Sequence, residues 1–169
     1  MSLLRTLRAR LAALGSTPTA GSTVPPHPTV DWGERVGSQD DTPVVEYDPH
    51  PDGRPDPGEV VWAWVAYEDD PSQGKDRPVL LLAEQGGDWC ALMLTSKDHD
   101  RDAADEARWG RYWMDVGSGA WDSQGRPSEV RLDRLLRLPE SAIRREGAAL
   151  DRAIFDQVLA EARTFHELA

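Results

Sequence analysis

Residues 77–82 read Arg-Pro-Val-Leu-Leu-Leu and residues 91–96 read Ala-Leu-Met-Leu-Thr-Ser, and these two stretches decide the fold. Each contains a short apolar run typical of a β-strand. Gln85-Gly86-Gly87 between them is typical of a tight turn, so the pair predicts a hairpin. Arg77 enters the first strand and Thr95 leaves the second. We therefore expect a guanidinium and a hydroxyl at the mouths of strands, where they can bind an anion.

Three further strands extend this hairpin into a sheet. Residues 59–67 are rich in apolar and β-favouring side chains, which predicts a strand covered on both faces. Residues 109–116 and 128–136 supply two more strands. Two helices are expected to close the chain, a short one after Pro139-Glu140-Ser141 and a longer one over residues 150–168, where apolar residues recur at helical spacing. This pattern predicts a mainly β fold with some α, a small and strongly bent antiparallel barrel.

The amino-terminal third differs in composition from this domain. Residues 1–14 place leucines on one stripe and arginines away from it, which predicts an amphipathic helix that docks on the domain or on a partner. Residues 15–56 are rich in Pro, Gly, Ser, Thr and Asp and are expected to form a disordered acidic linker. Within it, Val44-Val45-Glu46-Tyr47 can add to a sheet edge or fill a groove. The compact domain is predicted over residues 57–169.

Composition excludes several classes of protein. The 169-residue chain carries a formal net charge of −11, which argues against nonspecific coating of nucleic acid, so any nucleic-acid site must be a local basic pocket. Cys90 is the only cysteine, which rules out an internal disulfide framework and a cysteine-rich zinc site. We interpret Cys90 as a packed thiol in a cytoplasmic protein. No stretch of about 18 uninterrupted apolar residues is present, which excludes an ordinary membrane-spanning helix.

Four motifs follow one another along the domain: Gly58-Glu59-Val60-Val61-Trp62, Lys75-Asp76-Arg77-Pro78-Val79-Leu80, Leu92-Met93-Leu94-Thr95-Ser96, and Ser128-Glu129-Val130-Arg131-Leu132-Asp133-Arg134-Leu135-Leu136-Arg137-Leu138. In this order they resemble the PemK/MazF-type toxins of bacterial toxin-antitoxin pairs. The resemblance covers nearly all of residues 57–165 and none of residues 1–56. It implies an SH3-like barrel, usually a homodimer, that acts as a metal-independent endoribonuclease on single-stranded RNA and has an antitoxin protein as its partner.

The resemblance also implies a reaction and a set of catalytic residues. In such enzymes the ribose 2′-hydroxyl attacks the adjacent phosphorus and leaves a 2′,3′-cyclic phosphate and a free 5′-hydroxyl, which requires a base, a proton source and fixed positive charge. By this resemblance Arg77 holds phosphate oxygens, Thr95 donates to one of them, Arg131 stabilises charge and Asp133 is the base. Arg131 and Asp133 are two apart on a strand, so both side chains emerge on the same face. Because an arginine has a pKa above about 12, charge stabilisation is a safer role for Arg131 than proton donation.

Neighbouring residues complete the expected site. We expect four of them to contact the substrate: Lys75, Ser96, Lys97 and Trp121. Aromatic faces stack on unpaired bases, and Trp109 and Trp113 also lie near the proposed mouth, although a packed core explains most of the seven tryptophans equally well. His99 is a competing base because histidine titrates near neutrality. No cofactor is expected.

Simpler interpretations stand beside these. Arg77 and Asp133 can form a surface salt bridge, and Thr95 can cap the end of a strand. Residues 98–102 imitate the start of a calcium loop, but the glycine due next is Ala103 and the closing glutamate is Trp109, so we reject a calcium site. The alternative to a ribonuclease is a non-catalytic SH3-like interaction module that binds a protein ligand in the same groove.

Overall fold

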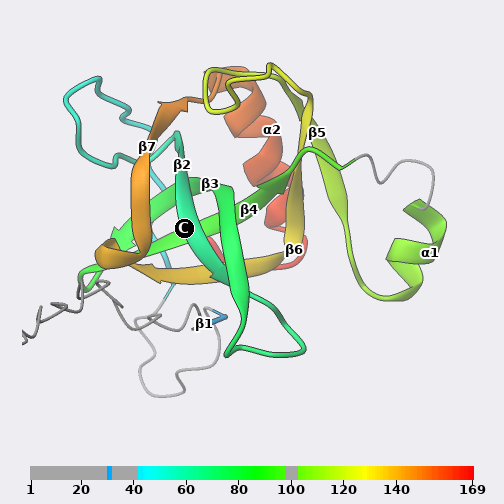
Figure 1. The fold of residues 1–169 in the computed structure, drawn as a ribbon. Coiled ribbons are helices and arrows are strands. Elements are labelled where there is room, and N and C mark those ends of the chain that lie inside the picture. The colour runs from blue at the N-terminus through cyan, green and yellow to red at the C-terminus, as the bar shows by residue number, and fades with distance from the viewer. Residues whose placement is uncertain (1–29, 32–41, 98–102) are drawn as a thin grey trace, which may run out of the picture.

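The computed structural model describes residues 30–31, 42–97 and 103–169 (Figure 1). The predicted helix over residues 1–14 lies outside the described residues. The strands are β1 (Val30–Asp31), β2 (Glu59–Ala66), β3 (Gly74–Gln85), β4 (Asp88–Thr95), β5 (Trp113–Gly117), β6 (Ser128–Pro139) and β7 (Ile143–Ala149). The helices are α1 (Ala103–Arg108) and α2 (Arg152–Ala162), with a 3₁₀ turn at Glu140–Ala142.

In the described parts of the chain, the seven strands form one antiparallel sheet. The strand order is β1-β6-β4-β3-β2-β7, and β5 also pairs with β6. The prediction of a mainly β fold with a C-terminal helix is confirmed. Figure 1 shows that the sheet is strongly bent, but within the described residues it is not closed into the expected barrel. Closure requires a hydrogen-bonded row between the two end strands, and here β1 pairs with β6 while β7 pairs with β2.

Strand β7 is absent from the prediction made on the sequence. The short helix expected after Pro139-Glu140-Ser141 is limited to one 3₁₀ turn, and the chain then runs back along β2. Residues 143–149 read Ile-Arg-Arg-Glu-Gly-Ala-Ala and show no clear alternation of apolar and polar residues. This segment is a strand because it pairs with β2, with register shifts near Val60 and Trp62. Its own sequence pattern does not predict a strand.

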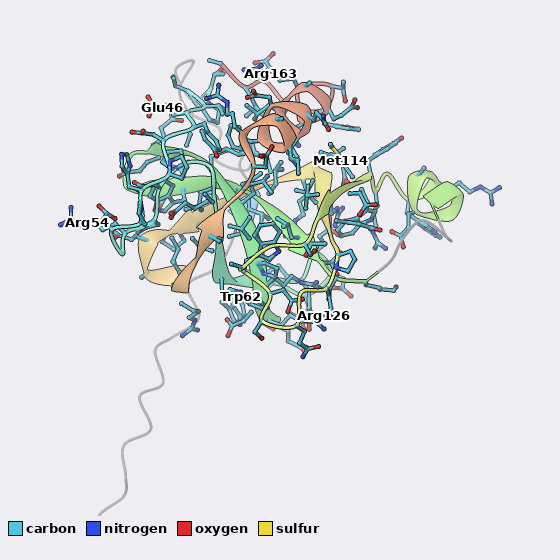
Figure 2. The ribbon with its side chains drawn as sticks, turned by 90° about the horizontal axis from the view of Figure 1, so that it is seen from above. Glu46, Arg54, Trp62, Met114, Arg126 and Arg163 are labelled. Carbon is cyan, nitrogen blue, oxygen red and sulfur yellow. The ribbon has the colours of Figure 1, made fainter. Side chains whose placement is uncertain are left out.

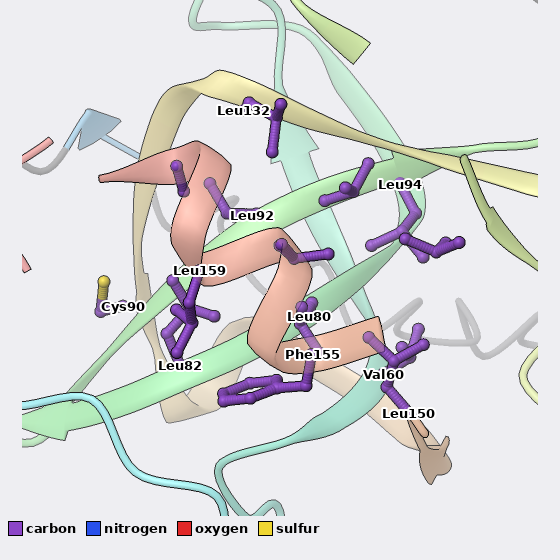
Figure 3. Packing of buried hydrophobic residues seen from close by; sticks show 14 of the residues in the cluster. Val60, Leu80, Leu82, Cys90, Leu92, Leu94, Leu132, Leu150, Phe155 and Leu159 are labelled. Atoms are coloured by element: carbon purple, nitrogen blue, oxygen red, sulfur yellow. The ribbon is translucent and has the colours of Figure 1, made fainter. Parts of the chain in front are cut away.

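The core lies on both faces of the sheet. Strand β2 is covered on both sides at its start, where Val60 enters the first cluster and Val61 the second. Further along, only one face is fully buried, because Trp62 and Trp64 on the other face are partly exposed. The first cluster is covered by α2, which packs Phe155 and Leu159 over β3 and β4 (Figure 3). Cys90 is buried in this first cluster, which confirms its interpretation as a packed thiol. The second cluster lies on the other face of β2, β3 and β4 and includes Val61, Leu81 and Met93.

Residues 43–48 lie against the domain, and we call them the strap. The backbone N–H of Val45 donates to the carbonyl of Ala169 at 2.9 Å, and the N–H of Glu46 donates to Leu82 at 3.1 Å. The Tyr47 hydroxyl donates to the carbonyl of Leu150 at 2.7 Å, and the Tyr47 ring contacts Phe155 at 5.0 Å between centroids. The prediction of disorder up to residue 56 is therefore wrong for the strap, because Val45 and Tyr47 pack against the first cluster and offset the cost of ordering.

Candidate functional site

A groove of about 410 Å³ lies where β2 and β4 end and where β3, β5 and β6 begin. Its lining contains five cationic side chains, Lys75, Arg77, Lys97, Arg111 and Arg131, together with Thr95 and Trp113. Three acidic residues share the lining: Glu68, Asp69 and Glu106. The groove thus collects positive charge from separate strands of a chain whose overall charge is strongly negative.

Strand register explains why Arg77 and Thr95 meet. In the β3–β4 pair Val79 lies opposite Met93, and both belong to the second core cluster. Arg77 and Thr95 lie two residues further along their strands, toward the same end of the pair. Side chains two residues apart lie on the same face of a sheet. The groove is therefore on the same face as the second cluster, just beyond its end. The expected meeting of this guanidinium and this hydroxyl is found in the structure.

Arg131 is buried and held by two carboxylates. Its Nη2 donates to Asp133 Oδ2 at 2.7 Å, and its Nε lies 3.1 Å from the same oxygen. On the other side, Nη1 donates to Glu68 Oε2 at 2.7 Å and Nη2 donates to Glu68 Oε1 at 2.9 Å. This is a bidentate pair of the kind that a guanidinium also forms with phosphate. Glu68 therefore occupies the position on Arg131 that a phosphate would need.

These contacts change the proton affinities of the cluster. Burial lowers the pKa of Arg131, but its hydrogen bonds with Asp133 and Glu68 act in the opposite direction and leave that pKa raised. The hydrogen bond from Arg131 lowers the pKa of Glu68 against the opposing effect of burial. Arg131 is consequently a fixed cation and a poor proton donor, as expected from the sequence.

Arg77 differs from Arg131 in its surroundings. Among the residues that the structure describes, none forms an ion pair with Arg77. Burial lowers the pKa of Arg77, and the neighbouring guanidinium groups of Arg134 and Arg131 lower it further, although Tyr67 opposes them. Three guanidinium groups therefore repel one another at this place, and an added anion would relieve the repulsion.

Asp133 is placed behind Arg131 rather than on the wall of the groove. Its Oδ1 accepts the backbone N–H of Tyr112 at 2.7 Å, and both of its oxygens contact Arg131. Its side chain is 12% exposed. The simpler interpretation, a surface salt bridge between Asp133 and Arg77, is not among the ion pairs of the described residues, where Asp133 instead pairs with Arg131. As the cluster stands, Asp133 orients Arg131.

The other predicted residues have separate locations. Lys75 and Lys97 line the groove, while Ser96 is exposed next to Thr95 and is not part of the lining. Trp121 is 6% exposed and donates to Ser128 Oγ at 3.2 Å, so the structure does not bring it to the groove. A different pocket contains it with Trp62 and Arg126, which Figure 2 shows together on the side away from α2. His99 lies outside the described residues.

Comparison with known proteins shows the family. Residues 56–166 match the sequence model of a family described as "PemK-like, MazF-like toxin of type II toxin-antitoxin system". The chain belongs to this family. A MazE-MazF complex from Deinococcus radiodurans contains a chain that is 26% identical, with a TM-score of 0.41, over 67% of this chain and 92% of that one. No curated protein matches this PemK/MazF-type chain.

Three residues of the groove in this PemK/MazF-type chain were not predicted from the sequence: Glu68, Glu106 and Arg111. Glu68 is the first carboxylate after β2, and its loop leads directly to Lys75. Glu106 lies near the end of α1 and Arg111 just after it, where the sequence predicts a strand, and their side chains pair at 3.5 Å. The sequence signal that could have identified Glu68 is its position, because it is a charged residue directly beyond the end of a predicted strand.

In the described parts of this PemK/MazF-type chain, no group of three or more His, Cys, Asp or Glu side chains is arranged to hold a metal ion. Neither of the helices described has the length and apolar character needed to cross a membrane.

Proposed function

We propose that this chain is a metal-independent endoribonuclease that cleaves single-stranded RNA and forms a 2′,3′-cyclic phosphate. The observation that supports this proposal is the groove, where Arg77, Thr95 and Arg131 converge with two lysines on a protein that is otherwise acidic. Fixed cations in a partly buried groove stabilise the negative charge that develops on a phosphate under attack. Membership of the PemK/MazF-type toxins favours RNA as the source of that phosphate.

In this proposal each residue has a defined role. Arg77 binds two phosphate oxygens, the Thr95 hydroxyl donates to one of them, and Arg131 stabilises the charge of the transition state. The 2′-oxygen forms a bond to phosphorus as the bond to the 5′-oxygen breaks. Asp133 accepts the 2′-hydroxyl proton, and the departing 5′-oxygen takes a proton from solvent. This role of Asp133 requires Arg131 to transfer hydrogen bonds from Asp133 to the phosphate, which frees a carboxylate oxygen.

We further propose that the protein is the toxin of a toxin-antitoxin pair, acts in the cytoplasm and works as a homodimer. The family description names a toxin-antitoxin system, which supports an antitoxin protein as partner. An antitoxin segment with carboxylates can bind the groove cations in place of RNA.

The proposal is tested with the purified full chain in EDTA and a mixed-sequence RNA. The wild type should produce fragments with cyclic phosphate ends. Arg77→Ala and Asp133→Asn should each lower the cleavage rate by about 100-fold or more, because each removes a group that acts on the reacting atoms. Arg54→Ala removes an exposed arginine outside the groove and should cleave like the wild type. Unchanged cleavage in both groove variants would contradict the assignment.

One observation favours the non-catalytic alternative. Glu68 neutralises Arg131 in the structure, as it would in a groove that binds a protein ligand and performs no chemistry. Binding of an acidic peptide that is lost in Arg77→Ala, with no RNA cleavage by the wild type, would establish the interaction module instead.

A further inference from the structure

A segment rich in arginine and aromatic residues leads out of the groove. Residues 108–113 read Arg-Trp-Gly-Arg-Tyr-Trp and join the end of α1 to the start of β5. Arg111 and Trp113 line the groove, whereas the Trp109 side chain projects into solvent and is 78% exposed. Figure 1 shows α1 standing clear of the sheet on the far side of β5. The segment therefore carries large apolar side chains from the groove to the surface.

Tyr112 connects this segment to the proposed catalytic cluster. Its backbone N–H donates to Asp133 Oδ1, and its carbonyl accepts the N–H of Leu132 at 2.8 Å. The Tyr112 ring packs on Phe165 with 4.8 Å between centroids, and the two residues remain 42% and 39% exposed. The pair thus presents aromatic surface to solvent while its backbone is fixed beside Asp133.

Trp109 is held by a hydrogen-bonded turn at the end of α1. Its N–H donates to the carbonyl of Glu106 at 2.9 Å, and the N–H of Arg111 donates to the same carbonyl at 2.9 Å. Gly110 closes the turn with a φ of 72°, a conformation that favours glycine. A ring on a fixed turn loses less conformational entropy when it binds a ligand than a ring on an irregular loop.

Exposed aromatic rings beside cations fit one class of ligand in particular. Single-stranded nucleic acids bind to surfaces where bases stack on aromatic faces and nearby arginines or lysines contact the backbone. Residues 108–113 carry both kinds of side chain and are continuous with a groove that has five cations. An apolar protein interface would instead favour a surface depleted of charge at its centre.

We propose that Trp109, Tyr112 and Phe165 form a stacking platform for the bases of single-stranded RNA that flank the phosphate bound in the groove. This inference rests on the proposed function and extends it to how the substrate is held. The platform acts through binding, since its rings lie outside the groove lining. We therefore expect it to contribute to the affinity for an oligonucleotide, which extends beyond the groove, and to contribute little to the affinity for a dinucleotide.

The test uses the full chain and a fluorescently labelled oligonucleotide of mixed sequence with 2′-O-methyl groups, which cannot be cleaved. Trp109→Ala should weaken binding about five-fold or more in an anisotropy titration, because a stacked base is lost. Trp109→Phe should retain most of the affinity, since any aromatic face can stack. Val44→Ala trims another exposed apolar side chain and is the matched control. The KM for an unmodified oligonucleotide should rise in Trp109→Ala while the cleavage of dinucleotides stays unchanged.

Each other outcome has a defined meaning. If Arg77→Ala loses RNA binding but Trp109→Ala binds like the wild type, the platform is wrong and the proposed function stands. If the wild type neither binds nor cleaves RNA, both fail. If Trp109→Ala leaves RNA affinity unchanged and lowers the sedimentation coefficient, the aromatic surface joins protein chains and the platform is overturned.

Discussion

At the scale of single residues, Arg131 is a buried cation that two carboxylates hold in a fixed position, where it can also bind an anion. Asp133 binds Arg131 from the same strand and also accepts the Tyr112 N–H, so it is fixed in place. Glu68 binds from the loop after β2, and its side chain is 40% exposed. Because Glu68 faces solvent, it is the partner that a phosphate can displace. We therefore expect Glu68 to compete with RNA for Arg131.

This competition predicts the behaviour of Glu68→Gln. The amide has no negative charge, so Arg131 should accept a phosphate more readily, and the affinity for an uncleavable 2′-O-methyl oligonucleotide should rise about five-fold, the equivalent of about 1 kcal/mol. Asp69→Asn removes the same charge from the groove lining without touching the Arg131 pair and serves as the control. Equal affinities of the two variants in anisotropy titrations would mean that net charge, and not the Glu68 pair, controls binding.

At the scale of elements, the strap and α2 stabilise one another. Helix α2 begins at Arg152, and the side chain of Asp151 caps it by accepting the N–H groups of Ala153 and Ile154. Tyr47 of the strap covers Phe155 from outside and donates to Leu150, just before the helix. The helix thus packs on the sheet through one face, and the strap contacts its amino-terminal end. The fold therefore begins before residue 57.

Loss of this contact should be measurable as a loss of stability. Tyr47→Ala removes a ring that packs on Phe155 and leaves the Leu150 carbonyl without its donor, so the free energy of unfolding should fall by about 3 kcal/mol. The neighbouring Val44 is 65% exposed, and Val44→Ala should change stability by less than about 0.5 kcal/mol. Urea unfolding followed by circular dichroism measures both. Equal midpoints for Tyr47→Ala and the wild type would show that the strap does not stabilise the fold.

At the scale of the whole molecule, the net charge of −11 opposes any extended contact with RNA. The groove provides five cations, but Arg131 is paired with Glu68 and Arg111 with Glu106. The groove cations that remain available to contact phosphates are Lys75, Arg77 and Lys97. Binding should therefore be local, with few phosphates neutralised.

The salt dependence of binding follows from this arrangement. With about three phosphates contacted, the logarithm of the association constant should fall with the logarithm of salt concentration with a slope of about −2. Lys97→Gln should make the slope less steep by about 0.7, because one contact is lost. Anisotropy titrations at several salt concentrations provide both slopes. A slope several times steeper would indicate an extended basic track instead of a local groove.

Local sequence patterns were sufficient for much of the fold. The strand at Asp88–Thr95 and the buried strand β2 follow from short apolar runs bounded by turns, because those signals act between neighbouring residues. That Arg77 and Thr95 lie at the same end of the hairpin was also predictable, since a tight turn joins their two strands. Their exact register was not, because a bulge between Leu81 and Ala83 shifts the pairing that the turn sets by one residue. The resemblance to the family's motifs predicted Arg131 and Asp133 as further residues of the site.

The other features of the fold and the site depend on contacts between residues that are distant in the sequence. The Glu68–Arg131 pair joins residues 63 positions apart, the strap contact of Tyr47 with Leu150 spans 103, and β7 becomes a strand only by pairing with β2. Trp121 is buried by its tertiary neighbours, although its sequence context is polar and rich in glycine. Periodicity records which face of an element is apolar but not which distant element covers it. The composition of the groove could therefore be predicted in part, whereas the partner of each charge within it required the folded chain.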